Sequence, residues 1–188
     1  MSSSPQARRG NTRQRIQDVA LELFAEQGYE KTSLREIAER LDVTKAALYY
    51  HFKTKEDIII SVFEDLTRPI DELIDWAKQQ LDMKREVLRR YSEAMAAGAP
   101  LYRFMQENQA TMRELSIGET VKRRLFTLVE LLRTEDGPLT DQVRCVSALF
   151  TLHAGMMFLQ HVEGDPEETR LAALEVATDL ITQAHEAS

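Results

Sequence analysis

Residues 32–55 of the chain read TSLREIAERLDVTKAALYYHFKTK, and this stretch predicts two short helices joined by a turn. Ser33, followed three residues later by Glu36, fits a capping box, which marks the start of the first helix. Thr44, after the turn, provides an N-cap for the second helix. Two short helices in this order form a helix-turn-helix motif, here expected over residues 33–52.

The second helix of the motif has side chains suited to DNA recognition, in which it enters the major groove. Between Val43 and Lys55 there are three lysines, one histidine, two tyrosines and two threonines but no acidic residue. Lys45 can donate to guanine, and Ala46 and Ala47 are small enough for close approach to the bases. The side chains that can donate to phosphates are Thr32, Thr44, Tyr49, Tyr50, His51, Lys53 and Lys55. Short helix pairs also occur in proteins that never touch DNA, so the pattern alone leaves both interpretations open.

The net charge of −7 opposes DNA binding when it is taken for the whole chain, because phosphate binding needs a basic surface. The charge is unevenly distributed, however. Residues 1–58 carry ten Lys and Arg and nine Asp and Glu, whereas residues 59–188 carry 14 and 22. Residues 1–17 contain four arginines and no acid, and we expect a flexible basic arm here that reaches phosphates or a minor groove.

The remainder of the chain predicts further helices. Apolar residues recur at helical spacing between breakers such as Gly28 and Pro69, and no convincing strand pattern is present. We expect an all-α protein of about nine helices, the first from Thr12 to Gly28. The helices lengthen after the motif, which indicates a DNA-binding domain over residues 10–70 and a larger helical domain over residues 71–188.

Several protein classes are excluded by what the sequence lacks. The single cysteine, Cys145, cannot form an intrachain disulfide, and its apolar surroundings indicate a buried side chain. The sequence contains no run of about 18 apolar residues, so it predicts no membrane span. Its first residues do not resemble a secretory signal. No catalytic constellation or local metal-ligand motif is found, so we expect a cytoplasmic protein that is not an enzyme and has no cofactor or metal.

Over residues 10–70 the chain resembles the tetracycline-repressor (TetR) family of bacterial transcription regulators. The resemblance rests on TSLREIA at 32–38 and VTKAALYYHFKTKE at 43–56, with ALELF at 20–24 and QGY at 27–29 before them. It implies a homodimeric repressor in which each subunit places the second motif helix in a major groove of a pseudo-palindromic operator. A small-molecule effector is implied to release the repressor from DNA.

The resemblance also implies roles for individual residues. Near the start of the first motif helix, the implied DNA contacts are Thr32, Ser33 and Arg35. The residues implied to face bases are Lys45 and Ala46, and those implied to contact phosphates are Tyr49, Tyr50, His51 and Lys55. Asp42 and Ala46 stand where the family often has glycine, and Asp42 tolerates a left-handed backbone less well than glycine does. The operator sequence is therefore not predictable.

The last two long helices are implied to form the dimer interface. We expect them over residues 139–162 and 167–186, where the second has one apolar face and the first has apolar residues on several faces. Two helices from each subunit would form an isologous four-helix bundle. The alternative is that residues 139–162 form the central helix of a monomer.

The effector site is implied to lie in the C-terminal domain. Its candidate residues are Trp76, Tyr91, Phe104, Met105, Met112, Phe126, His153 and Met156. The alternative for each is an ordinary core position, and the effector remains unknown. We expect effector binding to move the start of the fourth helix, near residues 54–66, and so change the separation of the two DNA-binding domains. Two alternatives remain: a regulator controlled by a protein partner or by its abundance, and a helical small-molecule carrier or enzyme without a role at DNA.

Overall fold

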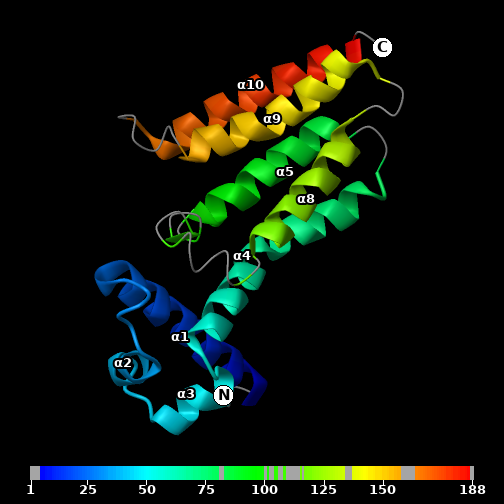
Figure 1. Cartoon of the computed structure of the whole chain (residues 1–188). Helices are drawn as coiled ribbons and strands as arrows, with labels where there is room; N and C mark the ends of the chain where they lie inside the picture. Colours follow the sequence, from blue (N-terminus) through cyan, green and yellow to red (C-terminus); the bar gives the residue numbers. More distant parts are fainter. Residues whose placement is uncertain are drawn as a thin grey trace. The chain divides into compact units, whose positions relative to one another are not determined.

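The computed structural model is helical, and it agrees with the predicted all-α class (Figure 1). It describes residues 5–80, 83–99, 101, 104–105, 108, 115, 117–133, 137–157 and 164–186. Eight helices lie within these residues: α1 (Pro5–Gln27), α2 (Leu34–Arg40), α3 (Lys45–His51), α4 (Lys55–Ala77), α5 (Lys84–Ala97), α8 (Ile117–Leu132), α9 (Leu139–Met157) and α10 (Pro166–Glu186).

The first helix begins earlier than predicted. It starts at Pro5 and not at Thr12, so the expected flexible basic arm is wrong from Pro5 onward. Proline is favoured at the first helical position because its missing N–H would have no partner there. The helix ends as predicted at Gly28, whose φ of +92° is left-handed and whose N–H donates to the Phe24 carbonyl over 3.0 Å.

The chain divides into two units, and the division differs from the expected domains. The first unit comprises residues 1–65 and 103–115, and the second comprises residues 66–102 and 116–188. The boundary therefore falls inside α4 at residue 65. A segment from the middle of the chain also joins the N-terminal unit, which sequence periodicity does not indicate.

The core of the first unit is formed by the apolar faces of its helices. On α1 the residues Ile16, Ala20, Leu23 and Phe24 are buried, as their helical spacing predicts. They are joined in the core by Ile37, Ala38, Leu41, Leu48, Phe52, Ile58, Ile59 and Val62. The two motif helices are too short to be stable alone, so this burial is what holds them in place.

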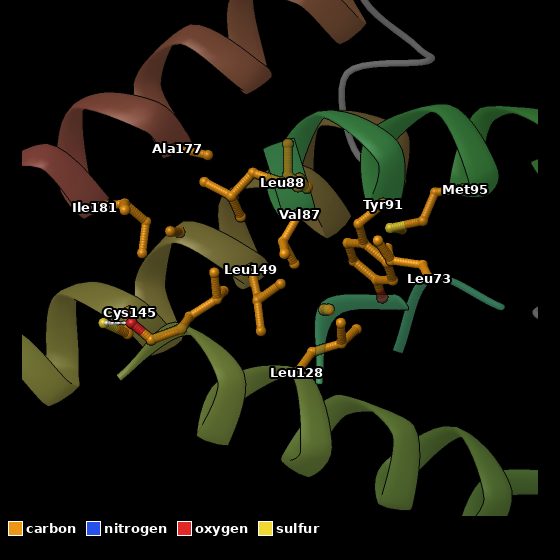
Figure 2. Packing of buried hydrophobic residues seen from close by; sticks show 14 of the residues in the cluster. Leu73, Val87, Leu88, Tyr91, Met95, Leu128, Cys145, Leu149, Ala177 and Ile181 are labelled. Carbon is orange, nitrogen blue, oxygen red and sulfur yellow. Dashed lines mark hydrogen bonds between the residues drawn. The ribbon is translucent and has the colours of Figure 1, made fainter. Parts of the chain in front are cut away.

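The core of the second unit is formed by α5, α8, α9, α10 and the second half of α4. Figure 2 shows Leu88, Leu128 and Leu149 from three of these helices directed into the same cluster. Cys145 is buried in it, as predicted, and its Sγ lies 3.4 Å from the Leu132 carbonyl oxygen. Burial raises the pKa of the Cys145 thiol, which keeps this side chain in its unreactive protonated form.

Helices α9 and α10 pack very closely at one point. A Cβ added at Gly155 on α9 would lie 2.7 Å from the Cβ of Ala173 on α10. Only a residue without a side chain permits this approach, so Gly155 is required by packing. Together with Ala173, Ala177 and Ala184, which are buried on α10, it gives the helix pair a seam of small residues.

The same two helices leave large apolar side chains exposed. On α9, Leu139, Val143 and Phe150 are 74%, 56% and 63% exposed, and their spacing places them on one side of the helix. On α10, Leu171 and Val176 are about half exposed. No helix in the described ranges combines the length and the apolar character that crossing a membrane would require.

Candidate nucleic-acid interface

The start of α2 is fixed by the predicted capping box. The Glu36 N–H donates to Ser33 Oγ over 3.2 Å, and the Ser33 N–H donates to Glu36 Oε2 over 2.7 Å. Hydrogen bonds from the Ser33 hydroxyl and N–H lower the pKa of Glu36, because they stabilise its charged form. The carboxylate therefore stays ionised at the helix start, where it also suits the helix dipole.

The turn between α2 and α3 contains a non-glycine residue in a left-handed conformation. Asp42 has a φ of +54°, which lies in the left-handed region that favours glycine. After it, the Val43 N–H donates to the Ala38 carbonyl over 3.1 Å, which closes the turn onto α2. Asp is among the residues that enter this region at modest cost, so the turn forms without glycine.

Helix α3 buries Leu48 and exposes the residues of its first turn. Its N-cap is Thr44, as predicted, whose Oγ1 accepts the Ala47 N–H over 3.2 Å. Leu48 is fully buried against the core, whereas Lys45, Ala46 and Ala47 are exposed. The first turn of α3 is therefore accessible from outside the unit. The exposed set contains the two residues expected to face bases.

Tyrosine, histidine and lysine gather at the C-terminal end of α3. Tyr50 is 66% exposed, and its ring meets that of His51 edge-on with centroids 5.3 Å apart. Lys53 Nζ donates to the Tyr49 carbonyl over 2.6 Å, and a cation there complements the negative end of the helix dipole. Lys45 Nζ lies 5.4 Å from the centre of the Tyr49 ring. This end of α3 therefore gathers four of the side chains that we expect to be able to donate to phosphates: Tyr49, Tyr50, His51 and Lys53.

Thr32 does not have the role that the resemblance implied. Thr32 is only 2% exposed. Its hydroxyl donates to the Gly28 carbonyl over 2.9 Å and accepts from Gln27 Nε2 over 3.1 Å. This hydroxyl is therefore not available for the expected phosphate contact, because its hydrogen bonds are made within the connection between α1 and α2. Ser33 and Arg35, its expected partners, are exposed.

Two of the expected basic contacts already have partners in the first unit. Arg35 Nε forms an exposed ion pair with Glu39 Oε1 at 2.7 Å. Lys55 Nζ donates to the Tyr29 carbonyl over 2.7 Å and lies 4.3 Å from the centre of the Tyr29 ring. Exposed ion pairs are weak, so the contact with Glu39 does not fix the Arg35 side chain. Lys55 is half-buried, and its carbonyl contact ties the start of α4 to the end of α1.

A buried polar contact between α1 and α4 was not found from the sequence. Gln17 is almost fully buried, and its Nε2 donates to Ser61 Oγ and to Asp65 Oδ2, over 2.8 Å in both cases. Buried polar groups that are fully paired fix one arrangement of the helices that they join. The available signal was the position of Gln17, which precedes Ala20 and Phe24 by three and seven residues on the apolar face of α1.

Among the expected effector residues, the structure brings Tyr91 and His153 together in the second unit. The Tyr91 hydroxyl lies 3.1 Å from His153 Nε2, and His153 Nδ1 lies 2.8 Å from the Leu149 carbonyl. Burial lowers the pKa of His153, so the ring is held neutral. A neutral ring that donates from Nδ1 to the carbonyl accepts at Nε2 from the tyrosine, which satisfies both groups.

The other expected effector residues are dispersed. Phe104 and Met105 belong to the first unit, where Phe104 is buried with ring centroids 5.7 Å from Phe24 and 6.1 Å from Tyr29. The effector role expected for Phe104 is therefore replaced by a packing role. Phe126 is 61% exposed on α8. Met156 packs on the core of the second unit, and Met112 lies outside the described residues.

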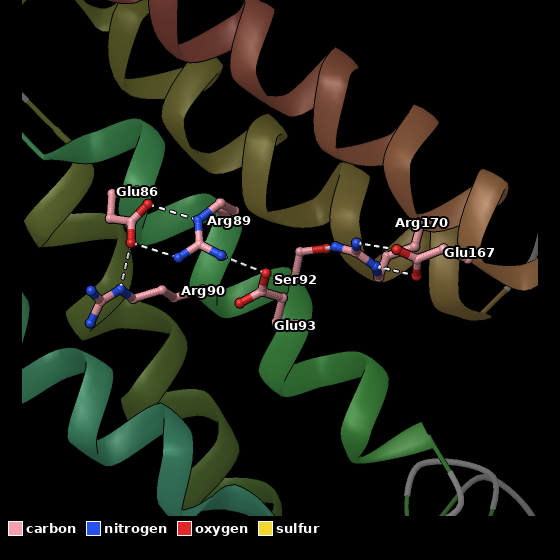
Figure 3. A network of polar contacts seen from close by, with 7 residues as sticks. All are labelled: Glu86, Arg89, Arg90, Ser92, Glu93, Glu167 and Arg170. Atoms are coloured by element: carbon pink, nitrogen blue, oxygen red, sulfur yellow. Dashed lines mark hydrogen bonds and ion pairs between the residues drawn. The ribbon is translucent and has the colours of Figure 1, made fainter.

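Trp76 is covered by an arginine that belongs to a polar network. The Arg90 guanidinium lies 4.0 Å from the centre of the Trp76 ring. Glu86 accepts from both Arg90 and Arg89, as Figure 3 shows, and these hydrogen bonds lower the pKa of Glu86 to about 2. The network links side chains on the surface of α5, and Arg90 covers one face of the Trp76 ring.

Comparison with known proteins gives matches to bacterial regulators. Residues 16–62 match the family model described as bacterial regulatory proteins, tetR family. Over 62 residues the chain is 50% identical to the HTH-type transcriptional regulator AcrR of Shigella flexneri, which covers 33% of this chain and 29% of that protein. Over 129 residues it is 32% identical to the A-factor receptor protein of Streptomyces griseus, which covers 61% and 46%. The chain thus spans less than half the length of these two relatives.

The fold is shared over a longer stretch than the sequence. A transcriptional regulator from Aquifex aeolicus matches with a TM-score of 0.72 at 23% identity, covering 90% of this chain and 99% of that one. At this identity the match shows the architecture alone. The match to the family model, residues 16–62, contains both α2 and α3.

Proposed function

We propose that this chain, whose residues 16–62 match the model of the tetR family of bacterial regulatory proteins, is a homodimeric repressor that binds a pseudo-palindromic DNA operator. The observation that carries the proposal is the surface of α3. Lys45, Ala46 and Ala47 are exposed together on the first turn, next to a properly formed N-cap. The first turn of a recognition helix is the part that meets base edges in the major groove.

We infer that the motif divides its contacts between bases and backbone. Lys45 donates to guanine O6 or N7, and the methyl groups of Ala46 and Ala47 permit close approach or contact with a thymine methyl. Ser33, Tyr49, Tyr50 and His51 hold phosphates, which fixes the register of the helix in the groove. Arg35 joins them after it leaves Glu39.

The dimer is proposed to form through α9 and α10. The exposed side chains of Leu139, Val143 and Phe150 on α9, with Leu171 and Val176 on α10, supply an apolar surface that water does not favour. Packed against the same surface of a second copy, they would make an isologous four-helix bundle. Two motifs related by this symmetry would read half-sites about one helical turn apart.

We further propose that an effector binds in the second unit and releases the repressor. The Tyr91–His153 pair supports this, because a small molecule that enters the apolar core can replace one partner of this hydrogen bond. On binding, α4 would move, since its residues belong to both units. Arg124 holds the second half of α4 through bidentate hydrogen bonds to Asp71, so this part would transmit the movement.

The proposed function is tested by DNA binding with a matched pair of lysine variants. The wild-type protein should bind the DNA upstream of its own gene more tightly than an unrelated duplex. Lys45→Ala should lower that preference by about 1–3 kcal/mol, because a base contact is lost. Lys31→Ala removes an exposed lysine outside the motif helices and should leave the preference unchanged. A wild-type protein without any sequence preference would refute the proposal.

A further inference from the structure

Arg13 on α1 is anchored to the residue that ends the recognition helix. Its guanidinium lies 4.5 Å from the centre of the Phe52 ring. Phe52 is the C-cap of α3, its N–H donates to the Leu48 carbonyl, and its ring is buried. In Figure 1 the N-terminal end of α1 lies next to α3. Arg13 is therefore placed at the C-terminal end of α3 by a buried aromatic platform.

The charge of Arg13 is not neutralised within the described part of the chain. The two arginines of α2, by contrast, form ion pairs with acids, Arg35 with Glu39 and Arg40 with Glu26. Arg13 has the Phe52 ring on one side of its guanidinium and no acidic partner among the described residues. A guanidinium stacked in this way keeps the N–H groups at its edge free to donate. The guanidinium of Arg13 can therefore donate hydrogen bonds to an anion.

The groups around Arg13 show which anion this position suits. Tyr50, His51 and Lys53 lie at the same end of α3, and the ammonium of Lys53 is directed to the Tyr49 carbonyl. Phosphates that approach Tyr50 and His51 therefore pass close to Arg13. Guanidinium groups bind phosphate oxygens in bidentate fashion, which a lysine ammonium cannot do.

We propose that Arg13 binds a phosphate of the DNA backbone at the C-terminal end of α3, with Phe52 as the platform that fixes its orientation. The inference rests on the proposed DNA binding and adds to it a contact from α1, outside the helix-turn-helix motif. The stacked guanidinium is ordered before DNA arrives, so little side-chain entropy is lost on binding. Because phosphates are the same for every sequence, Arg13 contributes affinity without base preference.

The test uses a fluorescently labelled duplex of arbitrary sequence, since phosphate contacts do not need the operator. The affinity of wild type, Arg13→Gln, Arg13→Lys and Arg15→Gln is measured as a function of salt concentration. Arg15 is an exposed arginine on the same helix, so Arg15→Gln removes the same charge without removing an aromatic contact. Circular dichroism establishes that each variant is folded.

Arg13→Gln should weaken binding roughly ten-fold at low salt and reduce the slope of log K against log salt by about 0.9 per bound subunit. Arg13→Lys should keep most of the slope, because it keeps the charge, and it also serves if the glutamine variant does not fold. Arg15→Gln should match the wild type. An unchanged slope in Arg13→Gln, or equal losses in both glutamine variants, would overturn the inference. A wild-type protein that binds no duplex would instead refute the proposed function.

Discussion

At the scale of single residues, burial separates side chains that hold the motif from those that are free to meet DNA. Thr32 and Ser33 are adjacent in the sequence, and both can donate to phosphate. Thr32 is buried and hydrogen-bonded to the backbone, whereas Ser33 is exposed. The Thr32 hydroxyl therefore stabilises the connection between α1 and α2, whereas Ser33 remains accessible from outside the unit.

Replacing Thr32 by valine tests this assignment. Thr32→Val should lower the free energy of unfolding by about 1–2 kcal/mol, because Gln27 loses its acceptor and the volume stays the same. The salt dependence of DNA binding should not change, since no phosphate contact is removed. Urea denaturation and fluorescence anisotropy measure the two quantities. A stable variant with a reduced salt dependence would restore the phosphate contact expected from the resemblance.

The local start and turn signals of the candidate site were predictable from sequence, and the orientation of its side chains was not. The caps of Ser33 and Thr44 depend on residues within three positions, so the pattern alone locates them. The direction of the Thr32 hydroxyl and of the Lys55 ammonium depends on where the α1–α2 corner lies in space. Such information is absent from local spacing.

At the scale of elements, the segment around Phe104 stabilises the N-terminal unit. Phe104→Ala should lower the free energy of unfolding by about 3–5 kcal/mol, because the ring is buried against Phe24 and Tyr29. Amide hydrogen exchange should rise in α1 and α2. Phe126→Ala removes an exposed ring and should change stability by less than about 1 kcal/mol. Equal effects of the two substitutions would argue against the packing role of Phe104.

The contact between α9 and α10 gives a prediction whose sign is the reverse of the usual one. Alanine normally stabilises a helix by about 1 kcal/mol relative to glycine. Gly155→Ala should instead destabilise the protein by about 1–3 kcal/mol, since the added Cβ would overlap Ala173. Gly118→Ala is the matched control on α8, where the added Cβ meets open space, and it should stabilise. Thermal unfolding compares them, and stabilisation by both would contradict the close approach.

Helices with strong local signals were predicted well, and long-range associations were not. The bounds of α3 follow from Thr44 and from the chain of small and aromatic residues after it. The start of α1 was misplaced because Thr12 was interpreted as an N-cap, whereas the helix already begins at Pro5. The return of residues 103–115 to the first unit leaves no local signal, since it depends on aromatic contacts between residues about 80 positions apart.

At the scale of the whole molecule, the proposed dimer depends on the exposed apolar surface of α9 and α10. Val143→Glu should convert the dimer to a monomer, because the substitution places a carboxylate from each subunit in an apolar interface. Sedimentation velocity measures the change. Ile60→Glu introduces the same charge at a partly exposed position on α4 and should leave the assembly intact. A Val143→Glu variant that remains dimeric would place the interface elsewhere.

The distribution of charge also belongs to this scale. The acidity of the chain lies in residues 59–188, and the ion-paired surface of α5 is part of that region. The recognition segment, residues 43–55, contains no acid. A sum over the whole chain therefore conceals a segment without acid that contributes to the proposed phosphate contacts.

The boundary inside α4 and the contribution of residues 103–115 have a consequence for engineering hybrid regulators. A fragment cut after residue 65 would end within a helix and would leave out Phe104. The rings of Phe24 and Tyr29 would then be uncovered, which favours aggregation of the fragment. A hybrid regulator therefore needs residues 1–65 and residues 103–115 from the same parent protein. If only the first piece is transplanted, the contact of Phe104 with Phe24 and Tyr29 has to be rebuilt with residues of the recipient.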